Sequence, residues 1–121
     1  MNLGIETRLS DQIARYLDLA TSEAKLTAAN MANIDTPGYQ AVGMDFEQEM
    51  RGAMTGLDKG LESQHVHVGL VDGLIARPDG NNVSMDREGL NLAEAQLKFK
   101  TGVALLHQEY QRVMNAIHSD K

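Results

Sequence analysis

A helical pattern ends and an irregular segment begins within the sequence Ala28-Ala29-Asn30-Met31-Ala32-Asn33-Ile34-Asp35-Thr36-Pro37-Gly38-Tyr39. Pro37 disfavours helical geometry at Thr36, and Gly38 suits the positive φ that position i+2 of a type II turn requires. Asn30 and Asn33 lie three residues apart, so their amides share one helical face, where they can bond the unpaired carbonyls of the helix end or a neighbouring helix. The sequence therefore predicts a helix that ends at Asn33 and a tight turn centred on Pro37.

Upstream of the turn, apolar residues recur at the spacing of a helix with one apolar face. They are Leu9, Ile13, Tyr16, Ala20, Ala24, Ala28 and Met31. Ser10 is a suitable N-cap, and Asp11 follows it in the first turn, where the helix dipole favours negative charge. We therefore expect a helix from about residues 8–11 to Asn33, roughly 35 Å long.

A longer apolar pattern fills the last third of the chain, with Ser84 as its expected N-cap. From Leu92 onward the apolar residues follow steps of three, four and seven, which is the a/d pattern of a coiled coil. We call the main part of this pattern the coiled-coil seam: Phe99, Val103, Leu106, Tyr110, Val113 and Ile117. Leu90, Leu97 and Met114 lie beside the seam and widen the apolar surface, which predicts contact with more than one neighbouring helix.

The segment between the two patterns lacks helical periodicity. Eight of the eleven glycines fall at positions 38–80, and glycine loses the most backbone entropy on ordering. We therefore expect a flexible segment or one with a small β structure. The local patterns within it predict a helical turn at 46–51, short strands at 65–68 and 69–71, and a turn at 77–81.

The expected fold is mainly α, with two long terminal helices that pair as a coiled coil around this glycine-rich centre. At 121 residues the chain forms at most one domain, which we divide into three parts. These are an N-terminal helix and turn (1–38), a flexible central segment (39–82) and a C-terminal coiled-coil helix (83–121). With few aromatic residues, the chain has little large apolar area to close a core alone, so we expect it to pack against other chains.

Composition excludes several classes of function. Eleven basic and seventeen acidic residues give a net charge of −6, which disfavours nucleic acid as a partner. No apolar run approaches the roughly 20 residues of a membrane span. The N-terminus lacks the basic region and apolar core of a cleavable signal peptide. The absence of cysteine excludes disulfides and thiolate chemistry.

The sequence contains no recognisable active site. His65 and His67 have a spacing that suits a metal ion if further ligands converge, but two solvated histidines in a loop are the preferred interpretation. No phosphate-binding loop, zinc-protease motif or nucleophile elbow occurs. We therefore expect no catalytic, cofactor-binding or metal-binding residues, no small-molecule substrate and no enzymatic activity.

The segment around the turn resembles the N-terminal signature of the flagellar rod and hook family of axial proteins. Seven residues match that signature: Asn30, Ala32, Asn33, Thr36, Pro37, Gly38 and Tyr39. Met31 stands where a branched aliphatic residue is usual. The similarity continues into 44–46 and resumes at Gly80, so it covers both ends of the chain and leaves 47–79 uncovered.

The resemblance implies a structural subunit of the proximal basal-body rod, which assembles through its terminal helices and helps to transmit torque from motor to hook. The signature residues would then hold subunits together or position helices. Its partners would be copies of itself, other flagellar rod and basal-body proteins, and the flagellar type III export apparatus. The chain would be exported without a cleavable signal peptide and would lie in the periplasm-spanning rod.

Three alternatives stay open at this point. A soluble helical binding module, such as an export chaperone or a secreted adaptor, would use the same heptads to hold one partner. A neighbouring rod subunit is a competitor within the family. A small metal-dependent enzyme is a more distant possibility.

Overall fold

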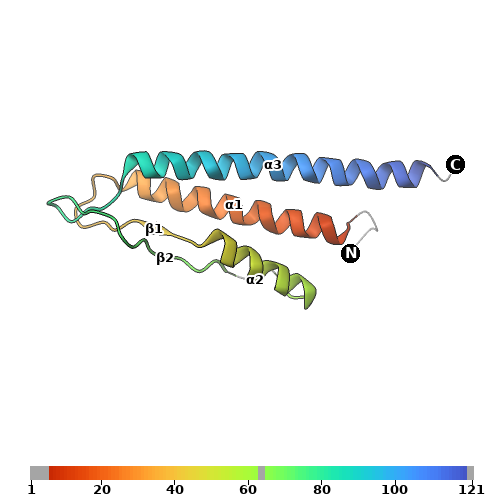
Figure 1. Ribbon diagram of the computed structural model, residues 1–121, viewed down its shortest axis with the longest axis horizontal. Coiled ribbons are helices and arrows are strands. Elements are labelled where there is room, and N and C mark those ends of the chain that lie inside the picture. The colour runs from red at the N-terminus through yellow and green to blue at the C-terminus, as the bar shows by residue number, and fades with distance from the viewer. Residues whose placement is uncertain (1–5, 63–64, 120–121) are drawn as a thin grey trace.

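Two long antiparallel helices, α1 (Arg8–Ala32) and α3 (Met85–His118), form the body of the computed structural model, which describes residues 6–62 and 65–119 (Figure 1). They pack along the length of α1, and α3 continues past the point where α1 begins (Figure 1). The prediction of a mainly α chain with long terminal helices is confirmed. No helix within the described ranges is long and apolar enough to cross a membrane.

The N-cap of α1 is Thr7, three residues before the predicted N-cap Ser10. Thr7 has extended backbone geometry, and its side chain accepts the N–H of Ser10 at 3.0 Å. In return, the Ser10 hydroxyl oxygen accepts the Thr7 N–H at 2.8 Å. The prediction of Ser10 as the N-cap was therefore wrong, because Thr7 and Ser10 form a reciprocal capping box in which Ser10 is the third helical residue.

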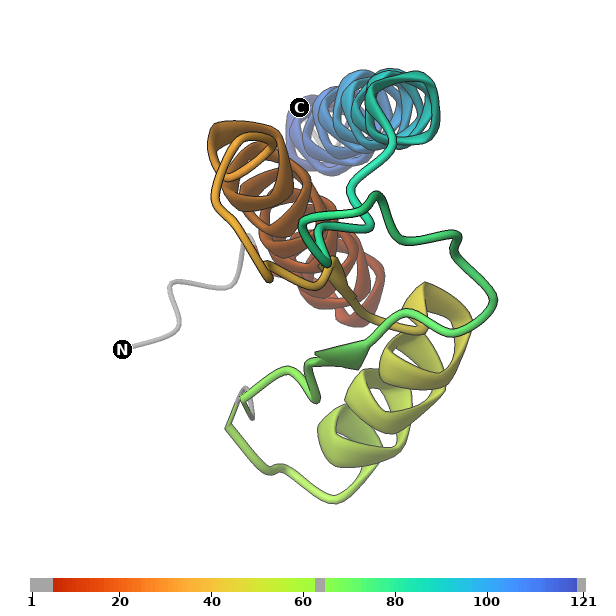
Figure 2. The ribbon, with the colours of Figure 1, turned by 90° about the vertical axis from the view of Figure 1, so that its left-hand side faces the viewer.

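The central segment contains a third helix, α2 (Phe46–Asp58), which packs against α1 (Figure 2). It runs for 13 residues where the sequence predicted a single turn. Asp45 caps its beginning by accepting the Gln48 N–H at 3.1 Å. A two-stranded antiparallel sheet joins β1 (Val42–Gly43) to β2 (Gly69–Leu70). The small β structure is thus present, whereas residues 65–68 form no strand.

The apolar core is small. Among the described residues, the buried apolar side chains are Ile13, Leu19, Ala20, Ala41, Val83 and Ala95. Several belong to α1, and the set contains no aromatic ring, so few large side chains are removed from water in the single chain. The predicted cap of α3 is confirmed, because the Ser84 hydroxyl accepts the Arg87 N–H at 3.3 Å.

Candidate assembly site

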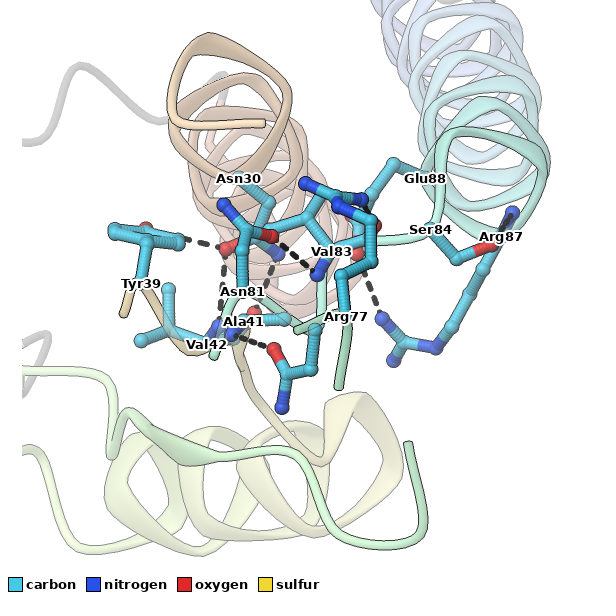
Figure 3. A network of polar contacts seen from close by, with 11 residues as sticks. Asn30, Tyr39, Ala41, Val42, Arg77, Asn81, Val83, Ser84, Arg87 and Glu88 are labelled. Atoms are coloured by element: carbon cyan, nitrogen blue, oxygen red, sulfur yellow. Dashed lines mark hydrogen bonds and ion pairs between the residues drawn. The ribbon is translucent and has the colours of Figure 1, made fainter. Parts of the chain in front are cut away.

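Asn30 fixes the end of α1 to the segment that follows it (Figure 3). Its buried side chain donates to the Val42 carbonyl at 2.8 Å and accepts the Val42 N–H at 2.9 Å. The Tyr39 hydroxyl donates to the same amide oxygen at 3.3 Å. One side chain thus satisfies both backbone groups of Val42 and holds β1 beside α1.

Gly38 brings two turns into contact. It has φ of 76°, and the Tyr39 N–H donates to the Thr36 carbonyl at 3.2 Å, which confirms the turn predicted at Pro37. The Gly38 N–H donates across to the carbonyl of Asp79 at 2.9 Å. A Cβ added to Gly80 would lie 3.3 Å from the Gly38 Cα. Both glycines have positive φ, so a side chain at either position would be strained, and at Gly80 it would also crowd the Gly38 backbone.

Asn81 connects the two turns through its side-chain amide. Its fully buried amide donates to the carbonyls of Asn33 at 2.8 Å and Thr36 at 2.9 Å. The amide oxygen accepts the Val83 N–H at 2.8 Å. Asn81 therefore connects the end of α1 to the residues that lead into α3.

Two further polar residues, Arg77 and Asn82, complete this network. The sequence pattern identified Asn30 and Tyr39 as site residues but not Arg77, Asn81 or Asn82. The Arg77 guanidinium donates to the carbonyl of Val83 at 3.0 Å and to that of Ile34. The Asn82 side chain accepts the Ala41 N–H at 2.6 Å. The available signal was the pair of consecutive asparagines, Asn81 and Asn82, shortly before the cap of α3, since such amides often bond nearby backbone groups.

The other signature residues lie at the exposed tip of the hairpin. Ala32, Thr36 and Pro37 are exposed, and Asn33 is half-buried. The Asn33 amide donates to the Ala29 carbonyl at 2.8 Å, and the Thr36 hydroxyl donates to the Asn33 amide oxygen at 3.0 Å. The signature thus consists of a buried anchor and an exposed tip.

A row of small or acidic residues forms the contact of α3 with α1. The buried positions of α3 recur every seven residues, at Glu88, Ala95, Gly102 and Glu109. A Cβ added to Gly102 would lie 2.5 Å from the Leu17 Cδ2 and 3.1 Å from the Tyr16 Cδ1. The two helices approach closely at this glycine, a feature that sequence analysis did not identify.

The coiled-coil seam lies beside this row on the flank of α3. Leu106 and Val113 are half-buried. Four seam residues keep 41–50% of their surface exposed: Phe99, Val103, Tyr110 and Ile117. The large apolar residues of the seam are therefore only partly covered within the chain and form an exposed apolar flank.

Phe46 lies where the three helices meet. Its ring packs edge-on against Tyr16, with 5.6 Å between the ring centroids. The Lys98 Nζ lies 3.8 Å from the Phe46 centroid and 3.1 Å from a carboxylate oxygen of Glu23. Burial raises the pKa of Tyr16, and the nearby Glu23 carboxylate raises it further. Lys98 therefore ties α3 to both α1 and α2.

Two buried carboxylates lie near the ends of the α1–α3 contact. Glu88 accepts a hydrogen bond from Arg87 at 2.7 Å, and its Oε2 is the buried side-chain atom without a partner among the described residues. Glu109 accepts from the Arg112 Nε at 2.9 Å. Because buried charges retain a desolvation penalty, this contact is less stabilising than an apolar seam of equal length.

The histidine pair forms no site within the described structure. His65 and His67 are exposed, and the His67 Nδ1 lies 2.9 Å from the Glu49 Oε1. Within residues 6–62 and 65–119, no group of three or more His, Cys, Asp or Glu side chains is placed to hold a metal ion.

A helical hairpin with a hydrogen-bonded tip and an exposed apolar flank defines a helical assembly protein. The flagellar basal body rod protein FlgB of Salmonella typhimurium (strain LT2) is 35% identical over 84% of this chain and 86% of the relative. FlgB of Escherichia coli K12 is 31% identical over 85% of this chain and 88% of the relative. FlgB of Cereibacter sphaeroides is 31% identical over 94% of this chain and 99% of the relative. No family model matches the chain. The chain belongs to the FlgB family.

Proposed function

We propose that this chain is a structural subunit of the flagellar basal-body rod, and not an enzyme, and that it assembles through the exposed apolar flank of α3. Membership of the FlgB family supports the rod as its location. The observation that carries the assembly mechanism is the partial exposure, at 41–50%, of four large seam residues in the single chain. A row of this length on a helix is covered when neighbouring helices pack against it.

The accessible area supports the same mechanism. The chain exposes 8245 Å², whereas a compact monomer of 13.2 kDa exposes about 6,400 Å². The excess is roughly 1,800 Å², and a standard interface covers about 800 Å² of each partner. The elongated hairpin thus presents more surface to neighbours than a compact chain of this mass would.

The partners in this proposal are further copies of the chain and other rod and basal-body proteins. Assembly places the chain in the proximal, periplasm-spanning rod, where many packed helices transmit torque to the hook. Delivery through the flagellar type III export apparatus, without a cleavable signal peptide, belongs to the same proposal. The net charge of −6 supports the absence of nucleic acid among the partners.

The signature residues have a positioning role in this proposal. Asn30, Asn33 and Tyr39 fix the end of α1 and the segment that leads to β1 through hydrogen bonds within the chain. The exposed Ala32 and Pro37 present the tip of the hairpin to a neighbouring subunit. The relatives named above are rod proteins and give no support to the chaperone or adaptor interpretation.

Val103→Asp tests the assembly mechanism. Val103 is largely exposed in the single chain, so the variant is expected to keep the helical content of the wild type. A charge in an interface without a partner opposes burial, so motility and the amount of chain in purified basal bodies are expected to fall together. The matched control is Gln48→Asp, which adds the same charge on an exposed position of α2. Normal motility with normal incorporation of Val103→Asp would contradict the mechanism.

A further inference from the structure

The two-stranded sheet has one edge that α1 closes and one edge that stays open. In antiparallel strands, residue pairs that exchange hydrogen bonds alternate with pairs whose N–H and C=O groups point away from the other strand. The Val71 N–H donates to the Ala41 carbonyl at 3.0 Å, so the next pair, Val42 and Leu70, is of the second kind. At the β1 edge, the Asn30 amide satisfies both outward groups of Val42.

Leu70 has the same two backbone groups on the opposite edge of the sheet. They face away from β1, because Leu70 is the residue paired with Val42. As both Figure 1 and Figure 2 show, β2 lies on the side of β1 that is turned away from the α1–α3 pair. Leu70 is also 62% exposed, so a further chain can reach this edge.

The chemistry of this edge suits an extended polypeptide segment. A strand that lies alongside supplies one acceptor and one donor at the spacing of the outward N–H and C=O of Leu70. Residues 65–75 contain neither lysine nor proline, which commonly protect a sheet edge against such pairing. Val68 is 52% exposed, so an added strand can also cover apolar side chains at alternate positions, opposite Val68 and Leu70.

The charges beside the edge favour a basic residue in the added strand. A surface groove of about 460 Å³ borders β2. Its charged side chains already have contacts within the chain: Arg87 with Glu88, His67 with Glu49, and Asp45 with the Gln48 N–H. Asp72 is exposed and forms no ion pair within the described part of the chain. A second copy paired antiparallel about Leu70 would place Asp72 opposite Val68, which leaves the carboxylate without a cationic partner.

We propose that the open edge of β2 binds an extended segment of another protein by strand addition. The added segment has apolar residues opposite Leu70 and Val68 and a lysine or arginine opposite Asp72. Its backbone bonds the N–H and carbonyl of Leu70, as the Asn30 amide bonds those of Val42. This inference rests on the proposed rod function and adds to it a contact that lies outside the two long helices.

Titration of the full-length chain with a strand-forming peptide tests the site. The probe is the hexapeptide Lys-Thr-Val-Thr-Val-Thr with blocked ends, which in antiparallel register places its lysine opposite Asp72 and its valines opposite Leu70 and Val68. Amide resonances of residues 68–72 are expected to shift on addition. A control peptide with an N-methyl group on its first valine lacks the N–H for the Leu70 carbonyl and is expected to bind about tenfold more weakly. Equal binding of both peptides, no binding, or shifts centred elsewhere would overturn the proposal.

A proline variant tests the same edge from the side of the chain. Leu70→Pro removes the outward N–H but no bond of the β1–β2 ladder, because Val71 is the donor to β1. The variant is expected to keep the circular dichroism spectrum of the wild type and to bind the probe about tenfold more weakly. Ile75→Pro, at a 91% exposed position beyond the strand, is the matched control and is expected to keep the wild-type affinity. Unchanged affinity of Leu70→Pro would contradict strand addition.

Purified basal bodies separate failure of this contact from failure of the rod function. The Leu70→Pro chain is expected there in smaller amounts than the Ile75→Pro chain. Equal amounts of the two variants would overturn strand addition and leave the rod function intact. Absence of the wild-type chain from basal bodies would overturn the rod function itself. Shifts of residues 68–72 with the concentration of the wild-type chain alone would show that a second copy takes the edge, and would overturn the assignment to another protein.

Discussion

At the residue scale, Asn30 illustrates how one amide supports two segments. Asn30→Ala leaves the N–H and carbonyl of Val42 without their side-chain partner. An unsatisfied buried polar group costs about 1–3 kcal/mol, so we expect the free energy of unfolding to fall by about 2–4 kcal/mol. Urea denaturation followed by circular dichroism measures this change. Asn115→Ala, at an exposed position of α3, is the control, with an expected change below about 0.5 kcal/mol.

Gly102 provides a second prediction, on the close approach of α1 and α3. Alanine is favoured over glycine in a helix by about 1 kcal/mol, so Gly89→Ala, with no atom near the added Cβ, is expected to stabilise the chain. Gly102→Ala has the same helical gain, but its Cβ displaces Leu17 and costs about 1–3 kcal/mol. The difference in melting temperature between Gly102→Ala and Gly89→Ala measures the cost of packing the added methyl group against Leu17. Equal stabilisation would show that the helices separate freely at this position.

The raised pKa of Tyr16 predicts that the free energy of unfolding falls as the pH rises in the alkaline range. Burial and Glu23 raise its pKa in the folded chain above the ordinary value of 10.0, so the folded state holds the phenolic proton more tightly. The stabilisation is present below about pH 10 and is lost as the pH rises through the folded pKa. Denaturant midpoints from pH 8 to 11 measure this loss. Tyr16→Phe is expected to lose less stability over that range, and an identical loss would contradict the assignment.

Residue-level roles were predictable where conformation dictates residue type. The Pro37 and Gly38 turn followed from backbone geometry alone. The contact row of α3 was not predictable, because an apolar pattern marks large residues, whereas this row contains Ala95, Gly102 and two glutamates. Large side chains were displaced to the flank, so the heptad pattern indicated a surface for neighbours and not the contact within the chain.

At the element scale, α2 shows why the central segment was difficult to predict. Gly52 and Gly56 disfavour a helix by propensity, and the sequence therefore predicted only a turn. Asp45 as N-cap, two acidic residues in the first turn and packing against α1 outweigh that cost. The sequence shows Asp45 as a possible N-cap of α2. It does not show the packing of α2 against α1, because that contact joins residues far apart in the chain. The three-part division at residues 38 and 82 stays a prediction.

Phe46 is expected to hold α2 on α1. Phe46→Ala removes the edge-on contact with Tyr16 and the contact with Lys98, each worth about 0.5–1.5 kcal/mol. Amide hydrogen exchange within Phe46–Asp58 should then accelerate about 5–150-fold, while exchange in α1 and α3 changes little. Phe99→Ala, on the exposed flank, is the control and should leave the exchange of α2 unchanged. Fast exchange of α2 already in the wild type would mean that this helix is open in the free chain.

At the scale of the whole molecule, a small core and a large exposed flank have one physical origin. The α1–α3 contact uses small and acidic residues, and most large apolar residues of α3 remain at the surface. A chain built in this way gains much of its apolar burial from neighbours, so its stability depends on assembly. The sequence predicted this dependence from composition, although it could not show which faces are exposed.

Stability should therefore depend on protein concentration. Subunits that bind the folded chain stabilise it by mass action, so each tenfold rise in concentration above the dissociation constant contributes about 1.4 kcal/mol, or about 5 °C in the melting temperature. Differential scanning calorimetry over a hundredfold range of concentration measures the effect. Val103→Asp should abolish the dependence without lowering the melting temperature at the lowest concentration, because this side chain is largely exposed in the single chain. Gln48→Asp, which adds the same charge on α2, should keep the dependence. A melting temperature independent of concentration in the wild type would mean that the exposed flank does not bind further copies, and other rod proteins would then have to cover it.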